Sequence, residues 1–502
     1  MRCFALLFVA QMVVGSSACA TQLAGAPDPP GAPESLDTAV SAALASGAIV
    51  NGLQWADIAG NPIQAHGAGI VRSGAFYYWF GESRNPDFTF KAVSIYRSGD
   101  LRSWEFRGNA LSQSSAAELG HANIERPKVV FNATTGQFVM WMHWENGTDY
   151  TEARAAVASA ATIEGPYTYR GSFRPFAATV VDHGKPGYMS RDCNLFVDTD
   201  GAGYFISTTN ENLDLHLYRL SADYLGISSL VATLFPGGQR EAPVLFKRNG
   251  VYVLLTSAAT GWAPNQANYA TSTALASGWS ALASLGDSTT FSSQPATVVA
   301  VQGSAGTSYL YAGDRWAGAW GGPYLDSMYV WLPLTFSSNT ALAMSGFQTL
   351  TINAAAGTIT GANPSFTFTG KASGKVMEVK GASTADHATV DQFTSNGGTH
   401  QRWTLDYDGA GYFRVTNVHS GKLLDVPSAS TADGAALVQF TSNGGNNQKW
   451  RVVDLGGGAV RLLNKNSGKV AEVFQSSSAD TAAIDQWAVN GGANQIWQLT
   501  TP

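Results

Sequence analysis

Five stretches of aromatic and aliphatic residues recur in the first two thirds of the chain, each following a turn that contains glycine. They are residues 76–80, 138–143, 204–207, 252–255 and 309–311. Short apolar runs bounded by glycine turns predict β-strands, and intervals of 48 to 66 residues leave room for a four-stranded sheet in each repeat. The pattern therefore predicts five β-sheet units between about residues 55 and 347.

A second apolar run lies 10 to 15 residues ahead of each aromatic stretch, and each begins with a polar residue. These residues are His66, Glu125, Asp192, Glu241 and Gln294. A single Glu beside an Arg is usually a surface ion pair. Five polar residues at the same position of an apolar repeat are not explained as solvated surface residues, because the innermost strands of such a repeat are covered on both faces. If these runs are the inner strands of a β-propeller, the five side chains meet at one mouth of its channel, where we expect an active site.

The C-terminal part contains a sharper repeat. Ser-Gly-Lys begins at 373, 420 and 467, Asn-Gly-Gly at 396, 443 and 490, and Gln-x-Trp at 401, 448 and 495, always 47 residues apart. Each copy alternates apolar and polar residues over short stretches and cannot bury its apolar face alone. We therefore predict three copies closed around one core.

Composition supports an all-β protein: 45% of residues are hydrophobic, only 13% are charged, and there are 54 glycines. The net charge of −6 lacks the basic excess that recruits nucleic acid or anionic lipid, so we expect neither a nucleic-acid nor a membrane partner.

The N-terminus has the pattern of a cleavable signal peptide. Arg2 precedes an apolar run at 4–14, and small residues end at Ala18-Cys19-Ala20. We predict cleavage after residue 20 and secretion; a lipid anchor at Cys19 is the alternative, although Ser16, Ser17 and Ala18 before it lack the aliphatic residue that such a site prefers. Cleavage leaves Cys193 as the single cysteine, so no intramolecular disulfide is expected. Residues 21–48, rich in Ala, Gly, Pro and Ser, predict a flexible spacer.

The Gln-x-Trp repeats resemble the ricin B-type β-trefoil of carbohydrate-binding module family 13. The resemblance implies galactose pockets built from an acidic residue, an aromatic platform and the pair of residues that opens Gln-x-Trp. The implied pockets are Glu378, Phe393, His400 and Gln401; Asp425, Phe440, Asn447 and Gln448; and Glu472, Trp487, Asn494 and Gln495. We interpret the Gln and Trp of the motif mainly as core residues. Only copy two keeps the usual Asp, and it has Val438 where the other copies have Asp391 and Asp485.

The region from about residue 52 to 336 resembles glycoside hydrolase family 43, and within it the exo-β-1,3-galactanases. The matching motifs begin with Ile63-Gln-Ala-His-Gly-Ala-Gly69 and Trp79-Phe-Gly-Glu82, and continue through Glu125-Arg-Pro-Lys128, Ser190-Arg-Asp192, Glu241-Ala-Pro243, Gly261-Trp-Ala-Pro-Asn265 and Gly313-Asp-Arg-Trp316. The predicted fold is a five-bladed β-propeller followed by a β-trefoil. The boundaries are signal peptide 1–20, spacer 21–48, propeller 49–350, linker 351–363 and trefoil 364–502.

The resemblance implies an inverting hydrolysis in which one carboxylic acid protonates the leaving oxygen and water attacks the opposite face. Glu241 matches the general acid, and Asp192 matches the carboxylate that raises its pKa. The Asp that most of the family place on the first inner strand is replaced here by Gln64-Ala-His66. We expect Gln294 to hold the attacking water, and we leave the proton acceptor open with Glu125 as the better chemical candidate.

Further site residues follow from the same motifs. Trp262 and Trp316 are candidates for stacking on galactose or for packing between blades, and Gln64, His66 and Arg126 are candidate substrate contacts. The few histidines form no zinc spacing, so we expect no catalytic metal and no cofactor, with a structural calcium left open.

These inferences favour a secreted exo-β-1,3-galactanase acting on the β-1,3-galactan main chain of arabinogalactan, with galactose bound at the trefoil. Two alternatives stay open. One is a different family 43 activity, such as α-L-arabinofuranosidase or β-xylosidase. The other is a non-catalytic galactose-binding lectin, since the expected Asp base is missing.

Overall fold

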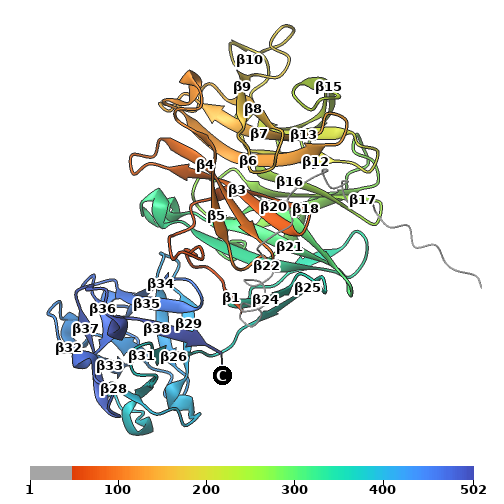
Figure 1. The fold of residues 1–502 in the computed structure, drawn as a ribbon. Helices are drawn as coiled ribbons and strands as arrows, with labels where there is room; N and C mark the ends of the chain where they lie inside the picture. The colour runs from red at the N-terminus through yellow and green to blue at the C-terminus, as the bar shows by residue number, and fades with distance from the viewer. Residues whose placement is uncertain (1–47, 502) are drawn as a thin grey trace, which may run out of the picture.

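The computed structural model describes residues 48–501, which form two β-rich parts (Figure 1). The predicted signal peptide 1–20 and all but the last residue of the predicted spacer 21–48 lie outside the described residues. The only helices in the described part are single 3₁₀ turns, and none is long and apolar enough to cross a membrane. The all-β prediction is confirmed.

The larger part contains five antiparallel sheets of four strands, each made from strands consecutive in the chain. They are β2 (His66–Ser73), β3 (Phe76–Arg84), β4 (Phe90–Ser98) and β5 (Glu105–Ser112); β6 (Asn123–Asn132), β7 (Gln137–Glu145), β8 (Arg154–Ala160) and β9 (Thr168–Phe173); β12 (Cys193–Val197), β13 (Gly203–Thr209), β14 (Asp214–Leu220) and β15 (Ile227–Leu234); β16 (Arg240–Arg248), β17 (Val251–Ala258), β18 (Ala267–Ser272) and β19 (Ala283–Leu285); β20 (Gln294–Gly303), β21 (Gly306–Arg315), β22 (Met328–Phe336) and β23 (Leu342–Met344). A short hairpin of β10 (Val181–Asp182) and β11 (Lys185–Pro186) precedes the third sheet.

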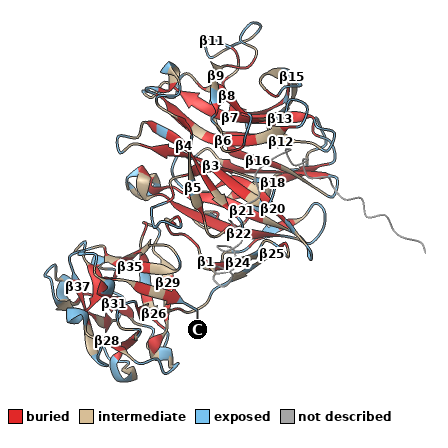
Figure 2. Ribbon diagram, viewed as in Figure 1, coloured by how far each residue is buried: buried red, intermediate tan, exposed pale blue. Residues whose placement is uncertain are grey.

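The first strands of the five sheets form a closed ring. Strand β2 contacts β6, β6 contacts β12, β12 contacts β16, β16 contacts β20, and β20 returns to β2. The aromatic stretches of the sequence are the second strands, β3, β7, β13, β17 and β21. They are almost wholly buried in the apolar clusters that fill the space between neighbouring sheets (Figure 2). Packing of sheet against sheet therefore holds the five inner strands together in the ring.

The end of the ring is tied to its beginning. Strand β1 (Ile49–Val50) pairs with β24 (Thr349–Asn353), which forms a hairpin with β25 (Thr358–Ala362). The hairpin contacts β21 and β22 of the fifth sheet. The segment 351–363, predicted as a linker, is thus mostly strand, because its alternating apolar residues Ile352 and Ile359 pack against the main core.

The second part, from Thr367 to Thr500, contains the three 47-residue repeats. Its strands are β26 (Thr367–Gly370), β27 (Val376–Val379), β28 (Ala388–Phe393), β29 (Trp403–Tyr407), β30 (Phe413–Asn417), β31 (Leu423–Asp425), β32 (Ala435–Ala436), β33 (Val438–Phe440), β34 (Trp450–Asp454), β35 (Ala459–Asn464), β36 (Val470–Val473), β37 (Ala482–Trp487) and β38 (Trp497–Thr500). The motif tryptophans Trp403, Trp450 and Trp497 are 0% exposed. Their indole N–H groups donate to the carbonyls of Met377, Leu424 and Ala471 in their own repeats. The repeat motif thus builds the core, as interpreted from the sequence.

Candidate active site

A pocket of about 590 Å³ opens where the first strands of the ring begin. Its lining residues are Glu82, Phe88, Glu125, Arg126, His143, Tyr150, Arg191, Asp192, Asn212, Glu241, Gly261, Trp262, Gln294 and Trp316. Four of the five polar residues predicted to converge are therefore brought together: Glu125, Glu241 and Gln294 come from the first strands of three sheets, and Asp192 directly precedes the first strand of a fourth.

The backbone bends sharply where three inner strands carry their polar residue. The strand register shifts just after His66, Glu125 and Glu241. The next residues, Gly67, Arg126 and Ala242, have φ of 60°, 51° and 52°. Such bulges re-aim side chains at the ends of strands, and a left-handed non-glycine residue costs about 1 to 3 kcal/mol. The surrounding sheets hold this strained geometry at the pocket.

Glu241 is a buried carboxyl group, 8% exposed. Its Oε1 accepts a hydrogen bond from the Gln294 amide at 2.9 Å, and its Oε2 accepts one from Asn212 at 3.3 Å. Burial, followed by the negative charge of Asp192, raises the pKa of Glu241 to about 8. A carboxyl group with this pKa is protonated at neutral pH and can donate a proton.

Asp192 lies just before β12 and is fixed by two donors. Its Oδ2 accepts the backbone N–H of Ala242 at 3.0 Å and pairs with Nε of Arg126 at 2.9 Å. Because Ala242 directly follows Glu241, the Asp192 carboxylate sets the position of the Glu241 backbone as well as the electrostatic potential at its carboxyl group.

Gln294 occupies all its hydrogen-bonding capacity within the protein. Its amide oxygen accepts from Arg126 Nη2 and from Trp316 Nε1, and its amide nitrogen donates to Glu241 and to Ser257. Since Arg and Trp side chains can only donate, the atom facing them must be the oxygen, and the NH₂ group must face Glu241. Gln294 therefore orients Glu241, and it could hold a water only by releasing one of these partners.

Glu125 is held as an anion by three donors. Its Oε1 accepts from Arg84 Nη2 at 2.7 Å and from the Tyr150 hydroxyl, and its Oε2 pairs with His143 Nδ1 at 2.9 Å. Burial alone would raise the pKa of Glu125, but hydrogen bonding and charge from His143, then Arg84, bring it well below its usual range. A carboxylate stabilised this strongly is a weak base, which argues against the preference for Glu125 as proton acceptor.

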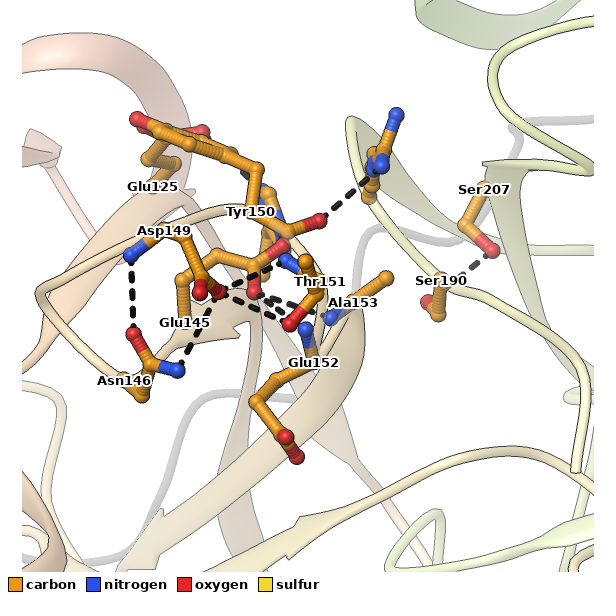
Figure 3. A network of polar contacts seen from close by, with 12 residues as sticks. Glu125, Glu145, Asn146, Asp149, Tyr150, Thr151, Glu152, Ala153, Ser190 and Ser207 are labelled. Atoms are coloured by element: carbon orange, nitrogen blue, oxygen red, sulfur yellow. Dashed lines mark hydrogen bonds and ion pairs between the residues drawn. The ribbon is translucent and has the colours of Figure 1, made fainter. Parts of the chain in front are cut away.

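His143 links Glu125 to a second acid, Glu145. Its Nε2 lies 2.9 Å from Glu145 Oε1, while Glu145 Oε2 accepts the backbone N–H groups of Glu152 and Ala153. Figure 3 shows the loop of residues 146–153, which joins β7 to β8, with the Tyr150 side chain extending from it toward Glu125. The two carboxylates overcome the effect of burial and raise the pKa of His143 to about 9. The imidazolium thus fixes both Glu125 and the loop that carries Tyr150.

Several lining residues were not predicted. Glu82 receives the Tyr324 hydroxyl at 2.8 Å, and burial raises its pKa to about 7 despite the nearby Arg84. It lies near the end of the aromatic strand β3, outside the polar positions of the inner strands, so the repeat did not mark it, although the motif Trp79-Phe-Gly-Glu82 was visible. Tyr150, 38% exposed, lies on a loop with no periodicity, which gave no signal at all.

Two predicted substrate contacts do not line the pocket. His66 is 0% exposed: its Nδ1 pairs with Asp314 at 2.9 Å and its ring stacks on Tyr329. Gln64 donates to the Leu325 carbonyl. Both predictions are corrected: aromatic rings pack around His66, and the Gln64 amide is held by the protein backbone. Trp262, 40% exposed, and Trp316, 8% exposed, do line the pocket, with ring centroids 5.5 Å apart.

One group in the described residues has ligand atoms close enough for a metal ion: Glu125, His143 and Asp192, within 4.8 Å of one another. Its chemistry does not fit. Both His143 nitrogens face carboxylates and act as donors, so neither offers a lone pair, and Asp192 is paired with Arg126. The geometry describes an ion-pair network.

The acidic residue of each trefoil copy is buried and held by an amide. Gln401 donates to Glu378 and Gln495 to Glu472, both at 2.7 Å, whereas in copy two Asn447 donates to the shorter Asp425 at 3.0 Å. In copy one His400 replaces the Asn and lies 3.4 Å from Glu378.

The remaining trefoil candidates divide into buried and accessible residues. Gln448 and Gln495 are 1% and 0% exposed, so their inclusion among direct sugar ligands is corrected: both donate to backbone carbonyls, and Gln495 also orients Glu472. Phe393 and Phe440 are partly exposed and Trp487 is 38% exposed, as aromatic platforms require. Asn494 donates to the Val473 carbonyl.

Each of the two parts of the chain matches the model of a known protein family. The family model of glycosyl hydrolases family 43 matches residues 60–316, and the ricin-type beta-trefoil lectin domain-like model matches residues 355–440 and 446–502. The comparison with curated proteins gave no match.

Among solved structures, an exo-β-1,3-galactanase from Clostridium thermocellum is 54% identical, covering 91% of this chain and 100% of that one, with a TM-score of 0.63. The exo-β-1,3-galactanase of Phanerochaete chrysosporium with β-1,3-galactotriose is 28% identical over 91% of this chain and 100% of that one, with a TM-score of 0.60. Its galactose complex is 30% identical over 90% and 100%, also with a TM-score of 0.60. The chain therefore belongs to glycosyl hydrolases family 43 and is a glycoside hydrolase with a ricin-type trefoil domain.

Proposed function

We propose that this protein is an exo-β-1,3-galactanase that hydrolyses the β-1,3-galactan main chain of arabinogalactan with inversion. The observation that carries the proposal is Glu241, a carboxyl group with a pKa of about 8, in a pocket whose neighbouring strands supply Asp192 and Glu125 as partners of buried cations. The similar exo-β-1,3-galactanases support the substrate class.

In the proposed mechanism Glu241 is the general acid. Its neutral form donates a proton to the glycosidic oxygen as the bond to the anomeric carbon breaks, and it becomes the carboxylate. The Gln294 amide then faces a developing negative charge, so its hydrogen bond strengthens as the proton leaves. Asp192 has the opposite effect, because its charge keeps the proton on Glu241 before the reaction.

Glu125 acts as a fixed negative charge. The transition state of glycoside hydrolysis has oxocarbenium character, and an anion that stays ionised lowers its energy. Inversion requires water to attack the anomeric carbon from the face opposite Glu241: a new C–O bond forms as the glycosidic C–O bond breaks, and the proton that this water loses passes to the solvent. Trp262 and Trp316 offer apolar faces for the C–H side of a galactose ring.

The trefoil in this proposal binds galactose units and raises the local concentration of polymer. We also propose that the five sheets are the blades of one propeller, and that the protein is secreted, as the sequence pattern at residues 1–20 indicates.

The identity of the sugars that the protein releases distinguishes this function from its alternatives. The native chain is incubated with β-1,3-galactan and with arabinoxylan, and the released sugars are identified by chromatography. Galactose from the galactan alone supports the proposal. Pentose from arabinoxylan alone favours an arabinofuranosidase or xylosidase, and no product from either by a folded, galactose-binding protein favours the lectin.

A further inference from the structure

One segment of the larger part lies between the catalytic pocket and the trefoil. This wall segment, residues 315–327, joins β21 to β22 and contains the 3₁₀ turns η2 (Ala317–Trp320) and η3 (Tyr324–Asp326). On its pocket side, Trp316 Nε1 donates to the Gln294 amide oxygen at 2.8 Å, and the Tyr324 hydroxyl donates to Glu82 at 2.8 Å. Two contacts of the pocket therefore depend on where this segment sits.

The other side of the wall segment is held by the trefoil. The guanidinium of Arg315 stands 3.7 Å from the centre of the Tyr407 ring, a close cation–π contact. Asp326 forms an ion pair with Arg451 at 2.7 Å. Arg315 directly precedes Trp316, and Asp326 follows Tyr324 by two residues, so each trefoil contact lies beside one pocket contact.

Arg315 also connects the trefoil to the strand that carries Gln294. It is 8% exposed, and its Nε and Nη2 donate to the carbonyls of Ser292 and Phe291 at 3.2 and 3.0 Å. These carbonyls lie just before β20. Tyr407 thus covers a buried cation that ties the end of β21 to the start of β20.

The wall segment and the trefoil also pack closely at a second place. A Cβ on Gly411 of the trefoil would lie 2.9 Å from the Trp320 ring. One apolar cluster, including Trp55 and Trp331 of the larger part and Trp403 and Trp450 of the trefoil, continues across the junction. A shared core limits relative motion of the two parts, so trefoil side chains can hold the wall segment in place.

We infer that the trefoil braces the catalytic pocket, with Tyr407 and Arg451 acting as positioning residues for Trp316 and Tyr324; this inference rests on the proposed galactanase function. Bracing of the pocket is a different role from anchoring of the enzyme to the polymer. Anchoring raises turnover only on substrates long enough to reach both sites, whereas bracing affects any substrate that enters the pocket.

The test uses the full chain with Tyr407→Ala, Arg451→Ala and both together, and soluble β-1,3-galactotriose as substrate. Small displacements of positioning groups reduce rates steeply, so the double variant should lose roughly tenfold in kcat/KM, mostly in kcat. Hydrogen–deuterium exchange at residues 315–327 should become faster, while galactose binding to the trefoil, measured by calorimetry, stays within about twofold.

Two matched controls separate bracing from general damage. Tyr407→Phe keeps the aromatic ring over Arg315 and should restore native kinetics. Arg402→Ala removes an arginine whose hydrogen bond runs to Gly397 inside the trefoil, and it should leave kinetics and exchange unchanged.

Folded double variants with native kcat/KM, or with native exchange at 315–327, would overturn the inference. If the native chain does not cleave the trisaccharide, the proposed function fails by itself. The brace is then judged by exchange alone: faster exchange at 315–327 in the double variant but not in Arg402→Ala supports it, and equal exchange refutes it.

Discussion

The proposed catalytic pocket and the trefoil both contain buried carboxyl groups, but they arrange them in opposite ways. In the pocket, Glu125 and Glu241 come from different sheets and have different neighbours, so their pKa values diverge: one falls well below its usual range and the other rises to about 8. In the trefoil, Glu378 and Glu472 repeat one contact, because each accepts a hydrogen bond from a Gln amide at 2.7 Å.

The difference shows what each arrangement is suited to. Hydrolysis needs one group that gives up a proton and another that keeps its charge, and convergence of unlike strands pushes pKa values apart. Binding a repetitive polymer needs the same contact several times, which a repeat supplies directly.

Removing the proposed acid should have the largest effect. Glu241→Gln keeps the shape and the contact with Gln294 but has no proton to donate, so kcat on soluble β-1,3-galactotriose should fall by about 10²–10⁴. Initial-rate assays measure this, with trefoil binding to galactose as a control for folding. Near-native turnover would remove Glu241 from the mechanism.

Removing the equivalent buried glutamine from any of the three repeats should lower the free energy of unfolding of the trefoil by a similar amount. The buried Gln439 donates to the carbonyls of Ser383 and Ala385 in the preceding copy. Gln439→Ala leaves these groups unpaired and should lower the free energy of unfolding of the trefoil by about 2–3 kcal/mol. Urea unfolding followed by tryptophan fluorescence measures the loss.

The equivalent residues Gln392 and Gln486 make the same type of contact and provide the comparison. Their alanine variants should lose a similar amount. A loss confined to one copy would contradict the equivalence of the repeats.

The charge of Asp192 should control the alkaline limit of activity. Glu241 is active when protonated, and burial followed by Asp192 raises its pKa to about 8, so activity falls as pH rises through this value. Asp192→Asn removes the like charge, lowers the pKa of Glu241 and should move the alkaline limb of kcat/KM about one unit toward lower pH. A pH–rate profile measures the shift, and a shift to higher pH would contradict the assigned role.

Substitution of a trefoil carboxyl group should have the smallest effect, and it should appear in binding to the polymer. Glu472→Gln weakens one pocket and should reduce retention on insoluble β-1,3-galactan by about two- to fivefold, because the other copies still bind. Depletion assays measure retention. Asp425→Asn is the comparison for copy two, whose shorter acid and Val438 make a different pocket; equal losses on each substitution would mean that this difference has no consequence for binding.

The alternation of apolar and polar residues by itself determined the β class, the five aromatic strands and the 47-residue trefoil repeat, since these follow from local periodicity and turn residues. It also placed Glu125, Asp192, Glu241 and Gln294 at equivalent positions of four inner strands. The family resemblance then supplied the expected roles, because spacing alone does not distinguish an acid from an ion pair.

Only the tertiary structure decided what each of these groups faces. It placed His66 under aromatic rings, engaged Gln294 with Arg126 and Trp316, and surrounded Glu125 with three donors. It also brought Tyr150 into the pocket and turned the predicted linker 351–363 into a hairpin. The physical reason is that pKa and hydrogen bonding depend on neighbours from distant sheets, which become neighbours only when the ring closes.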